Sequence, residues 1–315
     1  MRIFISGATG FVGHHLVDFL SSSEHTIYGT SYPHHPPSSE KNIDFLDIRK
    51  EKEVFRIIEK TKPHWIFHFA AVSNVRHSWE MRKETLETNL MGTFYFFEAA
   101  RKFCPECRFL FISSSDIYGG MLPEEELLQE ENSFHVLSPY SFSKVSGELL
   151  SRFYNQVEEL DVLIARPFPH TGPGQSPDFV CSDWARQIAR IEANLSQPVI
   201  RVGNIEVKRD FSDVRDVVKA YFLLLEKGKR GETYNVCSEK GVSLKQIIEL
   251  LLSNSSPEIA VEADPKKFRK ADIPILVGSS QKIRRDTGWK PEIPLEKTLL
   301  DLLEYWRKRI KKEAS

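Results

Sequence analysis

Residues 1–20 read MRIFISGATGFVGHHLVDFL, and this stretch decides the fold. Arg2–Ser6 is rich in β-branched and aromatic residues and predicts a strand, whereas the apolar spacing over Phe11–Ser21 predicts a helix. Between them, Gly7 permits a tight turn, Gly10 admits a pyrophosphate close to the backbone, and Gly13 lets the helix pack on the sheet. This strand–turn–helix arrangement predicts a dinucleotide-binding site.

Strands and helices are expected to alternate through the rest of the first half. Further strands are predicted at Thr26–Thr30, Ile43–Leu46, Trp65–Phe69, Arg108–Ser113 and Val162–Arg166, and helices at Lys52–Lys60, Thr85–Phe103 and Tyr140–Val157. The alternation is typical of an α/β protein with a Rossmann-type, doubly wound parallel sheet. The acidic segment Met121–Ser138 is expected to be a surface loop.

After Arg166 the pattern changes to a Pro- and Gly-rich stretch over 167–177. Helices are predicted at Phe179–Ala193, Val214–Glu226 and Leu295–Lys312, and a strand at Thr233–Val236. We therefore expect a dinucleotide-binding domain over 1–166 and 213–238. A smaller, mixed α/β substrate domain is expected over 167–212 and 239–315.

Composition narrows the class of partner. The 315 residues carry 43 Lys and Arg against 44 Asp and Glu, a formal net charge of −1, so we expect no nucleic-acid partner and no membrane surface. No apolar run reaches the roughly 18 residues of a spanning helix, and the first residues leave no room for a signal peptide. With four scattered cysteines, this favours a cytoplasmic protein.

Cys104-Pro-Glu-Cys107 has the spacing of half a zinc site or a redox pair. No second Cys or His pair follows at zinc-ribbon spacing, so we interpret it as a helix-to-strand connection and predict no metal site.

The second strand gives the cofactor preference. It ends without the acidic residue that binds the ribose 2′-hydroxyl in NAD-selective sites. Hydroxyls such as Ser31, with His34 and His35, could accommodate a 2′-phosphate, so NADP(H) is favoured and NAD(H) remains possible; a solvated loop is the alternative for the two histidines. Asp47 and Ile48 stand where they could meet the adenine, although Asp47 could instead cap a helix.

Tyr140 and Lys144 stand one turn apart at the start of a predicted helix. A nearby ammonium is expected to lower the pKa of the phenol and make it a usable acid or base; an exposed helix pair is the alternative. Ser113–Ser115 follow a predicted central strand, where open α/β sheets bind ligands, although a simple strand-to-loop transition would also place serines there.

Together the motifs resemble the extended short-chain dehydrogenase/reductase family that acts on nucleotide sugars. The resemblance rests on the glycine turn, Phe69-Ala70-Ala71, Asn89-x-x-Gly92-Thr93, Ser113-Ser114-Ser115-x-x-Tyr118-Gly119, Tyr140-x-x-x-Lys144 and Arg166-Pro167-Phe168. The second half is most similar to the members that reduce a GDP-4-keto-6-deoxy sugar, through His170-Thr171-Gly172-Pro173-Gly174-Gln175 and the run from Arg209 to Val217.

The resemblance implies roles for particular residues. Ser114, Tyr140 and Lys144 would be catalytic, with Asp116 at the position where related dehydratases carry a Glu that moves sugar protons. Cofactor contacts are implied for Gly7, Thr9, Gly10, Phe11, Val12, Gly13, Ser31, Asp47, Ile48, Ala70, Ala71, Asn89, Tyr140, Lys144 and Pro167. Substrate contacts are implied for Ser73, Ser115, His170, Gln175, Asn204, Arg209, Arg269 and Asp272. Pro169 departs from the family pattern, which has Asn there.

The implied activity is NAD(P)H-dependent reduction of the C4 keto group of GDP-4-keto-6-deoxy-mannose to GDP-rhamnose. The alternatives are 4,6-dehydration of GDP-mannose or another nucleotide-sugar conversion, and a cofactor-binding protein without turnover. The resemblance also implies a homodimer through the helices at 85–103 and 140–157, which carry the aromatics Phe94, Phe97, Phe153 and Tyr154.

Overall fold

The computed structural model describes residues 1–31, 42–120, 126–268 and 273–314. Its main sheet has seven parallel strands in the order β11-β6-β5-β4-β1-β2-β3. They are β1 (Arg2–Ser6), β2 (Thr26–Ser31), β3 (Ile43–Phe45), β4 (Trp65–His68), β5 (Arg108–Ile112), β6 (Asp161–Pro167) and β11 (Thr233–Val236). The chain reverses direction across the sheet between β1 and β4, which confirms the Rossmann-type, doubly wound fold.

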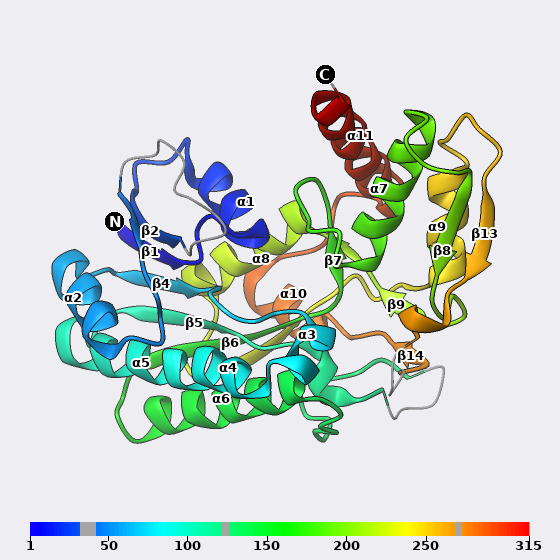
Figure 1. Ribbon diagram of the computed structural model, residues 1–315. Helices are drawn as coiled ribbons and strands as arrows, with labels where there is room; N and C mark the ends of the chain where they lie inside the picture. The colour runs from blue at the N-terminus through cyan, green and yellow to red at the C-terminus, as the bar shows by residue number, and fades with distance from the viewer. Residues whose placement is uncertain (32–41, 121–125, 269–272, 315) are drawn as a thin grey trace.

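Helices cover both faces of the sheet (Figure 1). One face packs against α1 (Phe11–Leu20), α8 (Val214–Lys227) and α10 (Gln281–Thr287). The other packs against α2 (Glu51–Thr61), α5 (Gly92–Phe103) and α6 (Pro139–Gln156). Two of the aromatics assigned to a dimer interface, Phe97 and Tyr154, are buried in this second layer, because their helix positions face the sheet.

The helix expected over Thr85–Phe103 is interrupted. It consists of α4 (Arg82–Leu86), a π-helical turn η1 (Glu87–Met91) and α5, and a short α3 (Val75–Glu80) precedes it. The wider turn contains Asn89, whose buried amide bonds the backbone of Val72 rather than facing solvent. Such π-turns are frequent at functional sites.

A second cluster of elements lies beside the sheet (Figure 1). Its core joins α7 (Val180–Glu192), α9 (Leu244–Leu252) and α11 (Leu295–Ala314). Short strands complete it: β7 (His170–Thr171) with β10 (Ser212–Asp213), β8 (Val199–Val202) with β13 (Ala260–Ala263), and β12 (Gly241–Ser243), β9 (Lys208–Asp210) and β14 (Ile275–Leu276) together. Two 3-10 turns are η2 (Ser115–Tyr118) and η3 (Pro265–Lys267).

The prediction of a surface loop over Met121–Ser138 holds for most of the described residues, 126–138, although the segment also makes inward contacts. Leu128 is buried and pairs with Gly278, and the carbonyl of Glu130 accepts a hydrogen bond from Arg166. Leu128 and the Glu130 carbonyl therefore anchor the segment to the molecule, whereas Val136 and Leu137 are exposed, as expected of a surface loop. Within the described ranges, no helix has the length and apolar character needed to span a bilayer.

Candidate active site

The glycine turn lies between β1 and α1 and has the shape of an anion cradle. Gly7 has φ 71°, a left-handed conformation that favours glycine. A Cβ on Gly13 would lie 2.2 Å from the Gly7 carbonyl oxygen, so the helix can approach the turn only with glycine there. Gly10 is the N-cap of α1 and offers no capping side chain. The helix start is thus suited to a pyrophosphate, and the turn fits a dinucleotide.

The end of β2 lies next to this turn. The Thr30 hydroxyl accepts a hydrogen bond from the Gly7 N–H at 3.0 Å. Ser31 is buried, and among the described residues none hydrogen-bonds its hydroxyl. A buried hydroxyl without a partner suits a polar ligand group, so Ser31 fits the cofactor role. His34 and His35 lie outside the described residues.

Asp47 follows β3 and forms a bidentate ion pair with Arg49, at 2.9 Å to Nε and 2.8 Å to Nη2. This pairing lowers the pKa of Asp47 below its ordinary value. The alternative that Asp47 caps a helix is wrong, because Lys50 is the N-cap of α2. Ile48 is buried against Gly92 at the start of α5. Arg49 was not predicted from the sequence, and its ion pair with Asp47 identifies it as a cation next to the end of β3.

Residues after β4 connect the turn to the neighbouring helices. The Ala70 N–H donates to Ser6 Oγ, and Ser6 also bonds the buried His68, whose desolvation lowers its pKa to about 3. His68 is therefore neutral and bridges to Thr93 of α5. The Asn89 amide bonds the Val72 backbone and the Ser143 hydroxyl of α6, so this side chain positions the loop containing Ala71.

The four residues predicted to be catalytic come together at the carboxyl end of β5. Ser114 caps η2, and its hydroxyl accepts from the Asp116 N–H at 3.2 Å. A capping box between Ser138 and Ser141 begins α6, which buries Tyr140 and Lys144 one turn apart. Lys144 Nζ lies 5.7 Å from the centre of the Tyr140 ring. Ser114 hydrogen-bonds the Tyr140 phenol, and the negative charge of Asp116 raises the pKa of that phenol.

The expectation that the pKa of Tyr140 is lowered is wrong, and Lys144 is not among the groups that shift it. Burial raises the pKa of Tyr140 above its ordinary value and the charge of Asp116 raises it further, while the hydrogen bond from Ser114 lowers it. Lys144 is itself desolvated, which lowers its pKa to about 8, and Nζ donates to the Ile112 carbonyl at 2.8 Å. The phenol is therefore held protonated at neutral pH.

The Pro- and Gly-rich segment crosses to α1. The His170 ring stacks on Phe11 with centroids 6.2 Å apart, and burial lowers the pKa of His170. His15, which the sequence analysis missed, hydrogen-bonds the Pro173 carbonyl at 2.8 Å. Gln175 is buried and bonds the His170 carbonyl, so it fixes the shape of this segment.

The other predicted substrate residues are more scattered. Arg209, in β9, is mostly buried, and its guanidinium donates to the Lys208 carbonyl. Asn204 accepts from the Glu206 N–H, Ser73 is exposed after β4, and Ser115 is buried at the start of η2. Pro167 ends β6 and pairs with Val236, while the Pro169 carbonyl accepts from the Ser212 N–H. Thr9, Phe11 and Val12 lie in the glycine turn and the first turn of α1. Arg269 and Asp272 lie outside the described residues.

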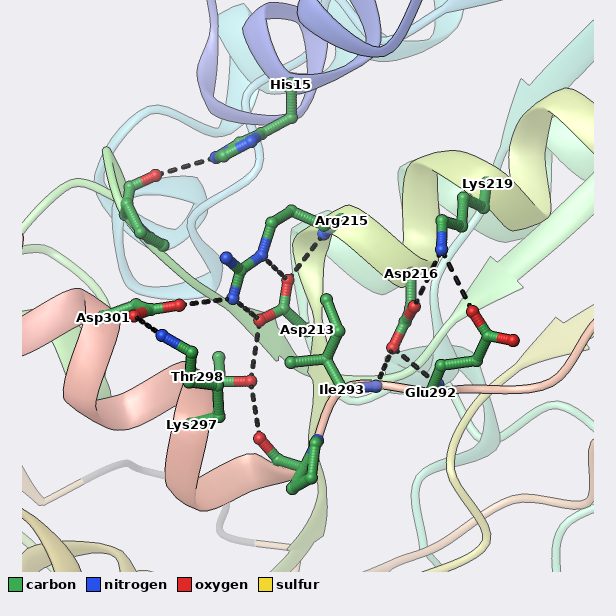
Figure 2. A network of polar contacts seen from close by, with 12 residues as sticks. His15, Asp213, Arg215, Asp216, Lys219, Glu292, Ile293, Lys297, Thr298 and Asp301 are labelled. Carbon is green, nitrogen blue, oxygen red and sulfur yellow. Dashed lines mark hydrogen bonds and ion pairs between the residues drawn. The ribbon is translucent and has the colours of Figure 1, made fainter.

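A polar network that the sequence analysis also missed fixes β10 (Figure 2). Asp213 caps α8 through the Arg215 N–H at 2.8 Å, and its carboxylate accepts from the Thr298 hydroxyl of α11 at 2.7 Å. The Arg215 guanidinium joins Asp213 and Asp301, at 2.6 and 2.8 Å. Because β10 pairs with β7, this network sets the position of His170.

Comparison with known proteins gives four findings. The family model described as GDP-mannose 4,6 dehydratase matches residues 4–302. The GDP-6-deoxy-D-mannose reductase of Pseudomonas aeruginosa is 36% identical over 313 residues, 99% of each chain. The structure of RMD from Pseudomonas aeruginosa complexed with NADPH has a TM-score of 0.86 at 34% identity, covering 98% of this chain and 99% of the other. A UDP-glucose 4-epimerase of Thermotoga maritima, solved with UDP-glucose, has a TM-score of 0.87 at 26% identity, covering 98% and 100%.

Proposed function

Because this chain belongs to the GDP-mannose 4,6 dehydratase family, we propose that it is an NAD(P)H-dependent oxidoreductase acting on a GDP-sugar. Its reaction is reduction of the C4 keto group of GDP-4-keto-6-deoxy-D-mannose to GDP-D-rhamnose. The full-length similarity to a reductase of this class supports the proposal, since 99% of each chain aligns.

The observation that carries the proposal is the convergence of Ser114, Tyr140 and Lys144 at the sheet edge that holds the glycine turn. Bound NAD(P)H supplies the reducing equivalents for the sugar carbonyl carbon. Tyr140 donates its proton to the carbonyl oxygen, and Ser114 hydrogen-bonds the phenol and aids that transfer. Lys144, fixed by the Ile112 carbonyl, places a positive charge beside the developing negative oxygen.

The protonation state of Tyr140 suits the role of proton donor in the reduction. A reductase begins with a phenol that gives up a proton, whereas oxidation of a sugar hydroxyl begins with a phenolate that takes one. Burial and the charge of Asp116 both raise the pKa of Tyr140, so the acid form dominates.

Two incubations distinguish this reduction from the alternative, 4,6-dehydration of GDP-mannose. A dehydratase returns the electrons that it removes and consumes no cofactor overall, whereas the reductase consumes one NAD(P)H per sugar. With the 4-keto-6-deoxy sugar we expect stoichiometric oxidation of NADPH, measured by its absorbance. With GDP-mannose we expect no keto product. Keto product from GDP-mannose with no NADPH consumption would assign the dehydratase activity instead.

We propose NADP(H) as the favoured cofactor and NAD(H) as a possible one. The end of β2 supplies the buried hydroxyl of Ser31 and no carboxylate. The similar Pseudomonas structure contains NADPH, which supports this preference. Fluorescence titration is expected to show NADPH binding at least as tightly as NADH, and a preference for NADH above about tenfold contradicts it.

The substrate residues form the second part of the proposal. His170, Gln175, Asn204 and Arg209 lie in the chain after β6, which supports a substrate domain over 167–212 and 239–315, apart from α10, which packs against the main sheet. Guanidinium groups suit diphosphate oxygens, so Arg209 is assigned to the nucleotide diphosphate. We also assign Ser73, Ser115, Arg269 and Asp272 to the substrate. Thermal shift measurements with GDP, UDP and TDP test the identity of the base. We expect GDP to raise the melting temperature more than UDP or TDP does.

We propose a homodimer through one face of α6. Phe142, Leu149, Phe153 and Val157 are about half exposed and recur at helical spacing, so they form an apolar stripe. A second copy presents the same stripe, and a two-fold axis would bury both. Sedimentation is expected to show a dimer, and Leu149→Asp a monomer. The control Leu195→Asp, at an exposed leucine elsewhere, should remain dimeric. A wild-type monomer at micromolar concentration contradicts the proposal.

We assign the enzyme to the cytoplasm.

A further inference from the structure

Two cysteines form a turn that the proposed reaction does not use. Cys104-Pro-Glu-Cys107 connects the end of α5 to the start of β5, as the sequence analysis expected for a helix-to-strand connection. The Cys107 N–H donates to the Cys104 carbonyl at 2.9 Å, which closes a β-turn. A β-turn holds its first and fourth Cα atoms within about 7 Å, and disulfides span about 4.4–6.8 Å. The backbone therefore places the two residues at disulfide separation.

The two thiols differ in accessibility. Cys104 is partly exposed, whereas Cys107 is buried. The side chains are neighbours, because interaction with Cys104 is the largest cause of a raised pKa at Cys107. An accessible thiol beside a buried one is the arrangement in which the first meets a reagent and the second resolves the product.

A carboxylate lies near the buried thiol. Asp161, at the start of β6, accepts from Arg108 Nε at 2.9 Å through Oδ2. Its other oxygen, Oδ1, is buried, and no hydrogen-bond partner for it exists among the described residues. The negative charge of Asp161 also raises the pKa of the Cys107 thiol. In this reduced state Oδ1 makes no hydrogen bond with the Cys107 thiol either, so it can accept that proton only after the side chain of Cys107 reorients.

We propose that Cys104 and Cys107 are a reversible disulfide-forming pair, oxidised by a small-molecule disulfide, with Asp161 accepting the proton of Cys107. The Cys104 thiolate, its proton lost to water, attacks the small disulfide and releases one thiol. Cys107 then gives its proton to Asp161 Oδ1 and attacks the Cys104 sulfur; the small-molecule thiolate that this expels takes up the proton and leaves as the second thiol. Overall, two protein thiols are oxidised and one small disulfide is reduced to two thiols.

The surroundings of Cys107 also favour the closed Cys104–Cys107 disulfide over its reopening. The neighbouring Cys104, burial and the charge of Asp161 raise the pKa of Cys107 well above its ordinary value. A thiolate that is costly to form is a poor leaving group, so the closed disulfide resists reopening. Slow formation and a stable product are expected.

The experiment uses the full chain, reduced and then incubated with oxidised glutathione. Remaining thiols are alkylated and the peptides are identified by mass spectrometry. We expect wild type to form a Cys104–Cys107 disulfide that dithiothreitol reverses, and Cys107→Ser to stop at a glutathione adduct on Cys104. Cys181→Ser, at a buried cysteine elsewhere, is the matched control and should behave as wild type. Four alkylatable thiols in wild type, or a stable glutathione adduct there, would overturn the pair.

A second variant tests the carboxylate separately. Asp161→Asn keeps the shape and removes the proton acceptor, so the mixed disulfide on Cys104 should persist about 10-fold longer before it closes. Cys104→Ser/Asp161→Asn should form no adduct at Cys107, because that thiol is buried. Closure of Asp161→Asn at the wild-type rate would remove Asp161 from the proposal.

Discussion

Lys144→Met is expected to lose activity. We also expect it to raise the free energy of unfolding above that of wild type by more at pH 7 than at pH 10. Lys144 is buried, and desolvation lowers its pKa from 10.5 to about 8. Keeping this ammonium charged in the folded state at pH 7 therefore costs about 3 kcal/mol relative to the unfolded chain. Methionine fills a similar volume and carries no charge.

The sign of the pH dependence follows from which state binds the proton more tightly. Below about pH 8 both states are protonated, and the full cost destabilises the wild-type fold. Between about pH 8 and 10.5 the folded lysine is neutral while the unfolded one is still charged, so raising the pH relieves the cost. The hydrogen bond to the Ile112 carbonyl, lost in the variant, lowers its stability by an amount that changes little over this range.

Denaturant unfolding of both proteins at pH 7, 8, 9 and 10 checks this. The free energy of unfolding of Lys144→Met, minus that of wild type, should fall by about 2–3 kcal/mol across the series. Lys83→Met, at a lysine whose side chain is 89% exposed, is the control and should show no comparable trend. A difference for Lys144→Met that stays constant within about 0.5 kcal/mol would refute the reasoning that burial makes this charge costly.

Three further outcomes are expected. Tyr140→Phe should lower turnover by at least about 10²-fold, with NADPH affinity nearly unchanged because the phenol acts on the sugar oxygen; steady-state kinetics retaining more than about a tenth of the rate would contradict this. Gly13→Ala should weaken NADPH binding in a fluorescence titration and lower the melting temperature, because its Cβ would lie 2.2 Å from the Gly7 carbonyl oxygen; wild-type affinity would argue against the cradle. Glu148→Gln should destabilise the fold by about 3–5 kcal/mol in urea, since it leaves the buried Arg166, now 2.7 Å from Glu148, without its counter-charge; a loss below about 1 kcal/mol would count against this pair.

The sequence predicted the sheet well because its signals are local. The glycine spacing over 7–13 and the alternation of strands and helices up to Arg166 needed only neighbouring residues, and the parallel sheet confirms them. The Tyr140–Lys144 pair was equally local, because four residues make one helical turn. The short strands β7 and β10 escaped prediction, since two residues carry no periodicity and their pairing joins positions 42 apart.

The charge state of the site depended on packing. The sequence shows an ammonium one turn from a phenol, but burial of both groups, with Asp116 and Ser114 beside the phenol, decides their pKa values. No pattern along the chain states how much water reaches a side chain.

The sequence by itself thus determined the strands of the main sheet and most of the helices that cover it, and which residue types stand at the carboxyl edge of that sheet. Only the tertiary structure decided that Phe97 and Tyr154 face the core, that Asp213 ties β10 to α11, and that Asp161 lies near Cys107. The physical reason is that propensity and period act between residues a few positions apart. Burial, electrostatic coupling and hydrogen-bond partnership act between residues that are distant in the chain and become neighbours only when it folds.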